Sequence, residues 1–274
     1  MYKRNTKRKK HYFCVSTAIM HTTVTMNIED IHRIHLAETS STNTYARQLA
    51  QQESILLVST DHQTAGRGQR GNSWEAEPGA NLLFSLAITP HGIRASQQFI
   101  ISELVSVALC EALSNYADNI RIKWPNDIYH RDHKLCGILI EHDIEGSTIA
   151  RSIIGVGLNV NQHRFTSDAP NPISLCHILG QETDRDTLLT EICDTFAAHY
   201  HDMLTAPDST LWRNTLHQHY TTLLYRLGAP APYRDVQGTF NAILRHVEPD
   251  GRLRLEDKQG TLRSYLFKEV EYII

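Results

Sequence analysis

Three glycines and two arginines lie together in one short segment, and these residue types can hold an anion. Gly66, Gly68 and Gly71 have the spacing G-x-G-x-x-G. Glycine lets backbone N–H groups approach a ligand closely, and the guanidinium groups of Arg67 and Arg70 add fixed positive charge and paired donors for a carboxylate or phosphate. We call residues 66–74 the glycine loop and expect it to bind an anion; a solvated basic turn is the alternative.

The elements on either side of the glycine loop limit what it can do. The apolar runs 55–58 and 82–88 are predicted buried strands. A dinucleotide-binding fingerprint needs a helix directly after the glycines, whereas Trp74 is followed by Glu-Ala-Glu-Pro-Gly and the second strand. A protein kinase is excluded because neither Asp-Phe-Gly nor Val-Ala-Ile-Lys accompanies the His-Arg-Asp sequence at 130–132. A strand therefore fixes the loop at each end.

Hydroxyl and amide side chains gather between a strand predicted over 28–36 and a helix predicted from Tyr45 onward. Ser41, Thr42 and Asn43 belong to this group. One such residue is explained as the N-cap of the helix, but the run is longer than one cap requires. Free N–H groups at the helix N-terminus could join these side chains in binding a polar, neutral group.

A second polar segment follows a long buried helix predicted over 96–113. The run 120–129 alternates like a strand but is broken by its proline, so Asn126 and Asp127 fall in a turn. Lys123 adds a cation beside this carboxylate, a combination that suits a nucleotide with its metal ion. Ordinary turn chemistry is the alternative for the Asn-Asp pair.

Two further predicted strands carry residues that need an explanation. Lys134 begins one of them; a lysine here is usually solvated, but it can also stabilise charge that forms in a reaction. Gly137, within the same strand, indicates close approach of a ligand or of backbone. The run 153–161 contains Asn159, whose burial is costly unless its amide is fully hydrogen-bonded.

Composition predicts a globular protein. The 274 residues are 41% hydrophobic with a formal net charge of -3, which allows one large or two smaller domains and gives no general attraction to nucleic acid or anionic membrane. Only the first ten residues are strongly basic, and the stretch 12–20 is too short and polar to cross a bilayer. We expect residues 1–27 to be a disordered basic tail or to precede the true start; a nucleic-acid-binding arm is the alternative.

Cysteine and histidine usage bears on compartment and metal binding. Five widely spaced cysteines without a Cys-x-x-Cys pair indicate a reducing compartment, so we expect a cytoplasmic protein. Sixteen histidines are present, but none forms a His-Glu-x-x-His motif. The sequence therefore predicts surface histidines and no structural metal.

Four motifs in order resemble one family. GRGQRGNSW, KWPNDIY, KLCGILIE and GVGLNVN together are similar to the catalytic domain of the biotin–protein ligases. The resemblance implies an α+β fold in which a mixed sheet is flanked by helices, followed by a small C-terminal β-barrel. Independently, the alternating segment 231–274, with turns at Asp250-Gly251 and Gln259-Gly260, predicts a small β domain. We place the catalytic domain at 28–228 and the C-terminal domain at 229–274.

The resemblance also implies a reaction. Family members use ATP and Mg2+ to join biotin to a lysine of a biotin carboxyl carrier protein through biotinyl-5'-AMP. Some relatives carry an N-terminal DNA-binding domain, for which residues 1–27 are too few, so neither DNA nor a membrane is an expected partner; homodimer formation stays open. The alternatives are a lipoate or octanoate ligase, for which the polar segment at 41–43 is less suited, and a non-catalytic biotin sensor.

Site residues follow from matching the motifs position by position. Arg67 and Lys134 correspond to the catalytic cations. The biotin-binding residues implied are Ser41, Thr42, Asn43, Gln63, Gly66, Arg67, Gly68, Gln69, Trp74, Lys134 and Gly137. The ATP-binding residues implied are Arg70, Lys123, Asn126, Asp127 and Asn159, with Asp127 as the Mg2+ contact. Many relatives have arginine at positions 69 and 72, where this chain has Gln69 and Asn72.

Overall fold

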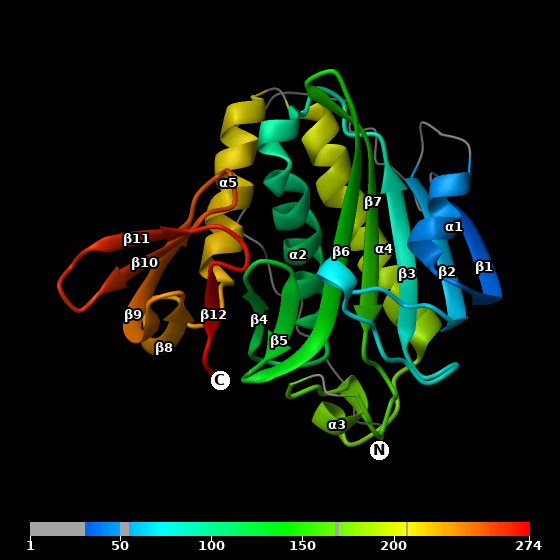
Figure 1. Ribbon diagram of the computed structural model, residues 1–274. Coiled ribbons are helices and arrows are strands. Elements are labelled where there is room, and N and C mark those ends of the chain that lie inside the picture. The colour runs from blue at the N-terminus through cyan, green and yellow to red at the C-terminus, as the bar shows by residue number, and fades with distance from the viewer. Residues whose placement is uncertain (1–30, 50–54, 168–169, 207) are drawn as a thin grey trace, which may run out of the picture.

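Two sheets and a group of helices form the part of the chain that can be described. The structure, a computed structural model, describes residues 31–49, 55–167, 170–206 and 208–274, so the predicted tail at 1–27 lies outside these ranges. A seven-stranded mixed sheet has helices on both faces, and a five-stranded antiparallel sheet stands beside it (Figure 1). The predicted α+β class, with a flanked mixed sheet and a second small β unit, is confirmed.

The larger sheet has the strand order β1-β2-β3-β7-β6-β5-β4. Strands β1 and β2 are parallel, and every other neighbouring pair is antiparallel. Its strands are β1 (Ile31–Thr39), β2 (Ile55–Gln63), β3 (Leu82–Ile88), β4 (Ile120–Lys123), β5 (Asp127–His130), β6 (His133–Glu145) and β7 (Thr148–Leu158). All seven residues of β3 are buried, as expected for a central strand covered on both faces.

Helices cover the two faces of this sheet unequally. One face carries α2 (Phe99–Leu113), α4 (Arg185–Thr205) and α5 (Ser209–Thr222), and the other carries α1 (Thr42–Gln48). Helix α2 is buried on almost every side because it packs against the sheet as well as against α4 and α5. The short α3 (Leu175–Leu179) lies at one end of the sheet (Figure 1).

Side-chain capping fixes where α4 and α5 begin. The Asp184 carboxylate accepts a hydrogen bond from the Thr187 N–H at 2.7 Å, and the Asp208 carboxylate accepts from the Thr210 and Leu211 N–H groups.

Among the described residues, no helix is both long and apolar enough to cross a membrane.

The smaller sheet follows α5 and has the order β11-β10-β9-β8-β12. Its strands are β8 (Pro230–Asp235), β9 (Gly238–Val247), β10 (Leu253–Asp257), β11 (Leu262–Tyr265) and β12 (Val270–Tyr272). The sheet is attached to the larger one near Trp124, whose indole N–H donates to the Gly251 carbonyl at 2.9 Å. The Trp124 ring also meets the Phe267 ring edge-on, with centroids 6.2 Å apart.

Two predicted elements are realised differently in detail. The run 120–129 is a hairpin of two strands, β4 and β5, joined across its proline rather than one interrupted strand. The first helix begins at Thr42, three residues before the predicted start. The hydroxyl and amide group therefore forms the first turn of α1 instead of preceding it, and Thr42 and Asn43 are buried.

Candidate active site

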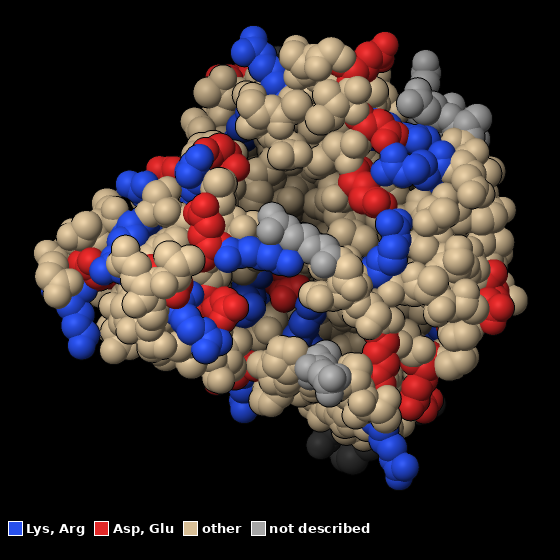
Figure 2. All heavy atoms as spheres, viewed as in Figure 1, with Lys and Arg blue, Asp and Glu red and all other residues tan. Residues whose placement is uncertain are grey.

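A cavity of about 890 Å³ opens between the glycine loop and strands β6 and β7. Figure 2 shows it as a hollow with lysine and arginine side chains around its rim. The residues of the predicted site that line it are Ser41, Thr42, Asn43, Gln63, Arg67, Gly68, Gln69, Trp74, Lys123, Asn126, Asp127, Lys134, Gly137 and Asn159. Gly66 lies beside Trp74, and the side chain of Arg70 lies outside the described part of the chain. The four motifs thus meet around one cavity.

The glycine loop folds back on itself as a narrow hairpin. The Gly68 N–H donates to the Asn72 carbonyl at 2.6 Å, and the Trp74 N–H donates to the Gly66 carbonyl at 3.0 Å. A Cβ atom at Gly66 would stand 2.8 Å from the Trp74 carbonyl oxygen, and Gly71 has a φ of 89°, in the left-handed region. These glycines are needed to shape the loop, and the loop in turn places Trp74.

Trp74 lies on two glycines of the sheet. A Cβ atom at Gly157 would stand 2.4 Å from Cε2 of the indole, and one at Gly137 would stand 2.8 Å from its Cζ3. The glycines of β6 and β7 therefore make room for an aromatic ring against the sheet surface. The indole Nε1 is buried and has no hydrogen-bond partner, so a donor remains at this point of the cavity wall.

One end of the cavity is a hydrogen-bonded polar group around the start of α1. The Thr42 N–H, a free donor of the first helical turn, donates to Oε1 of Gln63 at 2.8 Å. Oγ of Ser85, a buried serine of β3, lies 2.7 Å from Oγ1 of Thr42 and 2.6 Å from Oδ1 of Asn43. Neutral donors and acceptors thus cluster here, which suits a polar, uncharged group of a ligand.

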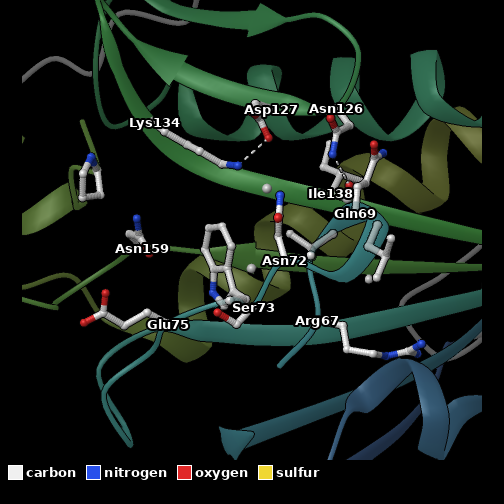
Figure 3. A pocket seen from close by; sticks show the side chains of 18 of the residues that line it. Arg67, Gln69, Asn72, Ser73, Glu75, Asn126, Asp127, Lys134, Ile138 and Asn159 are labelled. Carbon is white, nitrogen blue, oxygen red and sulfur yellow. Dashed lines mark hydrogen bonds and ion pairs between the residues drawn. The ribbon is translucent and has the colours of Figure 1, made fainter. Parts of the chain in front are cut away.

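Glu141 holds Arg67 beside this polar end. The guanidinium lies 3.3 Å from Oε2 of Glu141, and the same oxygen accepts from Nδ2 of Asn43 at 2.9 Å. About half of the Arg67 side chain is exposed. Figure 3 shows the side chain directed over α1, away from the opposite wall of the cavity. The carboxylate of Glu141 therefore fixes one of the two predicted catalytic cations at the rim.

Lys134 occupies the other side of the cavity. Its Nζ forms an ion pair with Oδ1 of Asp127 at 2.8 Å (Figure 3). The same atom lies 5.5 Å from the centroid of the Trp74 ring. Both side chains of the pair are mostly buried, with 26% and 14% exposed. The backbone of Lys134 is fixed as well, because its N–H donates to the Asn171 carbonyl at 2.9 Å. Arg67 and Lys134 thus border the same cavity without meeting each other.

Lys123 adds a third cation deeper in the same wall. Its Nζ lies 5.1 Å from the centroid of the Tyr129 ring and 5.0 Å from that of Tyr272, which belongs to the smaller sheet. Burial lowers the pKa of Lys123, an effect that the neighbouring Asp127 carboxylate opposes and the Lys134 ammonium reinforces. The C-terminal sheet thus contributes to this wall of the cavity.

Two asparagines are held by backbone groups near these cations. Nδ2 of Asn126 donates to the Ile138 carbonyl at 2.7 Å, and Nδ2 of Asn159 donates to the Ile173 carbonyl at 3.1 Å. Oδ1 of Asn159 is buried without a partner. Because an unpaired buried acceptor is costly, this atom is suited to receive a hydrogen bond from a ligand.

The Asp127 carboxylate suits a nucleotide-bound cation. Carboxylate oxygens are the hard ligands that Mg2+ accepts, usually together with substrate phosphates and water. Lys134 engages Oδ1 of this group and Lys123 lies nearby, so positive charge for phosphates and an oxygen ligand for a cation occur together. The donor set therefore fits a magnesium nucleotide.

Glu75 links the glycine loop to the segment after β7. Its carboxylate accepts hydrogen bonds from the Thr166 N–H and hydroxyl and from the Ser167 N–H, at 2.8 to 2.9 Å. Desolvation raises the pKa of Glu75, but the hydrogen bonds from Ser167 and Thr166 outweigh it and lower the pKa to about 2. Phe165 and Ser167 line the cavity, so the ionised Glu75 helps to position that side of the site.

Comparison with known proteins identifies the family. The model of the Biotin/lipoate A/B protein ligase family matches residues 36–159. The bifunctional ligase/repressor BirA of Bacillus spizizenii is 30% identical over 245 residues, which cover 85% of this chain and 72% of that protein. The chain belongs to the biotin–protein ligase family. The biotin–[acetyl-CoA-carboxylase] ligase of Paracoccus denitrificans is 29% identical over 82% of this chain and 94% of its own length.

The fold of the ligase agrees with solved structures. The biotin protein ligase of Aquifex aeolicus, in complex with biotin and ATP, superposes with a TM-score of 0.72 at 20% identity, over 88% of this chain and 99% of that one.

Several lining residues were not among those predicted from the sequence. Glu75 and Phe165 line the cavity, and Phe267 reaches it from the connection between β11 and β12. Ser85 and Glu141 do not line it but hydrogen-bond to the predicted residues Thr42 and Asn43. A serine inside an otherwise apolar central strand is a signal that could have revealed Ser85. No local pattern marks Phe267, because its place depends on how the two sheets pack.

Proposed function

We propose that this ligase attaches biotin to a specific lysine of a biotin carboxyl carrier protein in two steps, using ATP and Mg2+. In the first step, a biotin carboxylate oxygen bonds to the α-phosphorus of ATP, the bond to the bridging oxygen breaks, and pyrophosphate leaves. In the second step, the ε-amine of the carrier lysine attacks the acyl carbon of biotinyl-5'-AMP, AMP leaves, and the amine loses a proton.

One observation supports this proposal above the others: a neutral polar end and a cationic end share one cavity, with Trp74 on the wall between them. Thr42, Asn43 and Gln63 provide donors and acceptors suited to the ureido group of biotin. Lys134 and Lys123 provide positive charge suited to phosphates. Such a cavity would suit a ligand whose neutral head group lies at one end and whose carboxylate meets a nucleotide at the other.

In this proposal, the protein catalyses the first step by positioning the reactants and by stabilising charge electrostatically. Transfer at phosphorus concentrates negative charge, and fixed cations in a partly dry site stabilise it without a covalent intermediate on the protein. Lys134 meets the charge that develops at the α-phosphate. Arg67 supplies a second cation once it leaves Glu141, 3.3 Å away, for the ligand. Asp127 would hold Mg2+, which would help to neutralise the charge of the phosphates.

Names of relatives point to the same substrates. One relative is a biotin–[acetyl-CoA-carboxylase] ligase, and a structural neighbour holds biotin and ATP. The lipoate and octanoate ligases share the family model but require a longer apolar pocket. The polar group at Thr42 and Gln63 favours biotin.

The experiment that tests the complete reaction is biotin transfer to a purified carrier domain. The intact mass of the domain should rise by one biotinyl group when the ligase, biotin, ATP and Mg2+ are all present. A carrier domain with its target lysine replaced by arginine is the matched control and should stay unchanged. Modification by lipoate but not biotin, or no modification of the unsubstituted domain, would overturn the proposal.

A further inference from the structure

A cysteine and two histidines meet beside the short helix α3. Cys176 and His177 belong to α3, and His163 lies on the segment that follows β7. Each of the three offers one ligand atom, and these atoms all lie within 4.8 Å of one another. Sγ of Cys176 is 3.9 Å from Nδ1 of His163. His163 lies thirteen positions before the adjacent Cys176 and His177, so no short metal-binding motif marks the three residues in the sequence.

We propose that His163, Cys176 and His177 form a binding site for a borderline-soft divalent cation, Zn2+ in the first place. One thiolate and two imidazoles are a ligand set that Zn2+ uses, with a water molecule in the fourth position. The proposal is independent of the ligase reaction, since none of the three side chains is among the residues to which that reaction is assigned.

The hydrogen bonds around His177 favour metal binding over a simple polar cluster. Its Nε2 lies 3.1 Å from the His163 carbonyl oxygen, which can only accept, so Nε2 carries the proton. The lone pair is therefore on Nδ1, on the side of Ser174 and Cys176. Metal-bound histidines characteristically donate their other ring N–H to a carbonyl or carboxylate in this way.

Ser174 fixes the other side of the site. Its hydroxyl donates to the Gln162 carbonyl at 2.7 Å, and its oxygen lies 3.0 Å from Nδ1 of His177 and 3.1 Å from Sγ of Cys176. The single hydroxyl proton cannot be donated to both the Gln162 carbonyl and Nδ1 of His177, and a cation bound at Nδ1 would leave this proton to Gln162. The serine, itself fully buried, holds the two ligands in position.

The distances require only small movements. Ligand atoms of a tetrahedral zinc site are about 3.5 Å apart, given bonds of about 2.3 Å to sulfur and 2.0 Å to nitrogen. The sulfur is almost buried, whereas the ring of His163 is exposed and can rotate toward it; His177 is exposed too but is already oriented by its hydrogen bonds. An entering cation can therefore reach the site from solvent and be closed in by two surface side chains.

The position of the site suggests what a bound cation does. His163 precedes Phe165 and Ser167, which line the cavity, and Cys176 follows Ser174 at the other end of the same segment. A cation would tie both ends together in addition to the hydrogen bonds that Glu75 makes to Thr166 and Ser167. We expect occupancy to raise the melting temperature and to lower backbone exchange in this segment.

Cobalt titration of the full chain, without a histidine tag and under reducing conditions, tests the site. Co2+ should bind with one equivalent per chain, give the visible bands of a tetrahedral complex and a thiolate-to-cobalt charge-transfer band, and be displaced by Zn2+. Cys176→Ala should abolish the charge-transfer band, and His177→Ala should weaken Co2+ binding at least tenfold.

Controls separate this site from general surface binding. His91→Ala changes another exposed histidine and should leave the titration unchanged. Because Cys176 is buried and its replacement could disturb folding, the exposed His177 provides a second, independent variant, with circular dichroism to verify both. Absence of a thiolate band in the unmodified chain, or a titration that His177→Ala does not alter, would overturn the proposal.

Discussion

Adding a single methyl group at Gly157 should displace Trp74 and impair the site. Gly157 lines the cavity, and a Cβ atom there would stand 2.4 Å from Cε2 and 2.6 Å from Nε1 of the indole. Ordinary contact begins near 3.4 Å, so Gly157→Ala has to move the ring by about 1 Å. The backbone of β7 cannot yield as easily, because it pairs with β3 on one side and β6 on the other.

The expected effect follows from this displacement. A misplacement of about 1 Å in a positioned site can reduce activity by roughly 100-fold. Because the ring belongs to a loop, the protein can relieve the contact without unfolding, so we expect the melting temperature to change little. Gly137→Ala should act in the same direction but less strongly, since its Cβ atom would stand 2.8 Å from the indole.

A double-mutant cycle isolates the cause. Biotin-dependent pyrophosphate release should be measured for Gly157→Ala, Trp74→Ala and the double variant, with circular dichroism as the control for folding. In the Trp74→Ala background the Gly157→Ala change should have almost no further effect, because the atoms it would meet are gone. Equal losses from Gly157→Ala in both backgrounds would refute the explanation by contact with the ring.

Three other changes test separate parts of the site and the core. Glu75→Gln should raise the KM for ATP several-fold. Because the pKa of Glu75 is about 2, the carboxylate contributes about 1 kcal/mol to the free energy of unfolding above pH 4.5, and this contribution is lost toward pH 2. The free energy of unfolding of the variant, measured in denaturant titrations, should therefore fall less steeply as the pH is lowered. Gln69→Arg should slow the release of biotinyl-AMP by adding a cation at the loop tip, and an unchanged rate in a filter assay would contradict this. The hydrogen bond to Glu103 raises the pKa of His217, so the protonated histidine stabilises the fold below pH 6.5 and this stabilisation is lost at higher pH. His217→Gln should remove this dependence of the free energy of unfolding on pH, and an equal dependence in both proteins would refute the explanation.

Part of the cavity lining was predictable from the sequence, where ordered motifs supply both the residues and the strands that carry them. The motifs GRGQRGNSW and KLCGILIE predicted Arg67, Lys134 and Gly137 as site residues, and the pattern of apolar residues predicted the strands around them. All three line the cavity. A glycine in a strand has few explanations other than close approach, and the contact of Gly137 with Trp74 is of this kind.

What could not be predicted depends on contacts between distant parts of the chain. The direction of Arg67 is set by Glu141, seventy-four residues later, and no local rule connects the two. His163 likewise becomes a neighbour of Cys176 and His177 only through the path of the segment after β7. The first helix began earlier than expected because Gln63 of β2 accepts from the Thr42 N–H, a tertiary contact that replaces a local cap.

Pyrophosphate release tests the central claim most directly. The ligase with ATP and Mg2+ should release pyrophosphate with biotin but not with lipoate or octanoate, and Lys134→Ala should reduce the rate by roughly 100- to 1,000-fold, the effect of removing one preorganised charge donor. Lys258→Ala, which changes an exposed lysine in the turn between β10 and β11, is the matched control and should keep the full rate. Release that does not depend on biotin, or that Lys134→Ala leaves unchanged, would contradict the account.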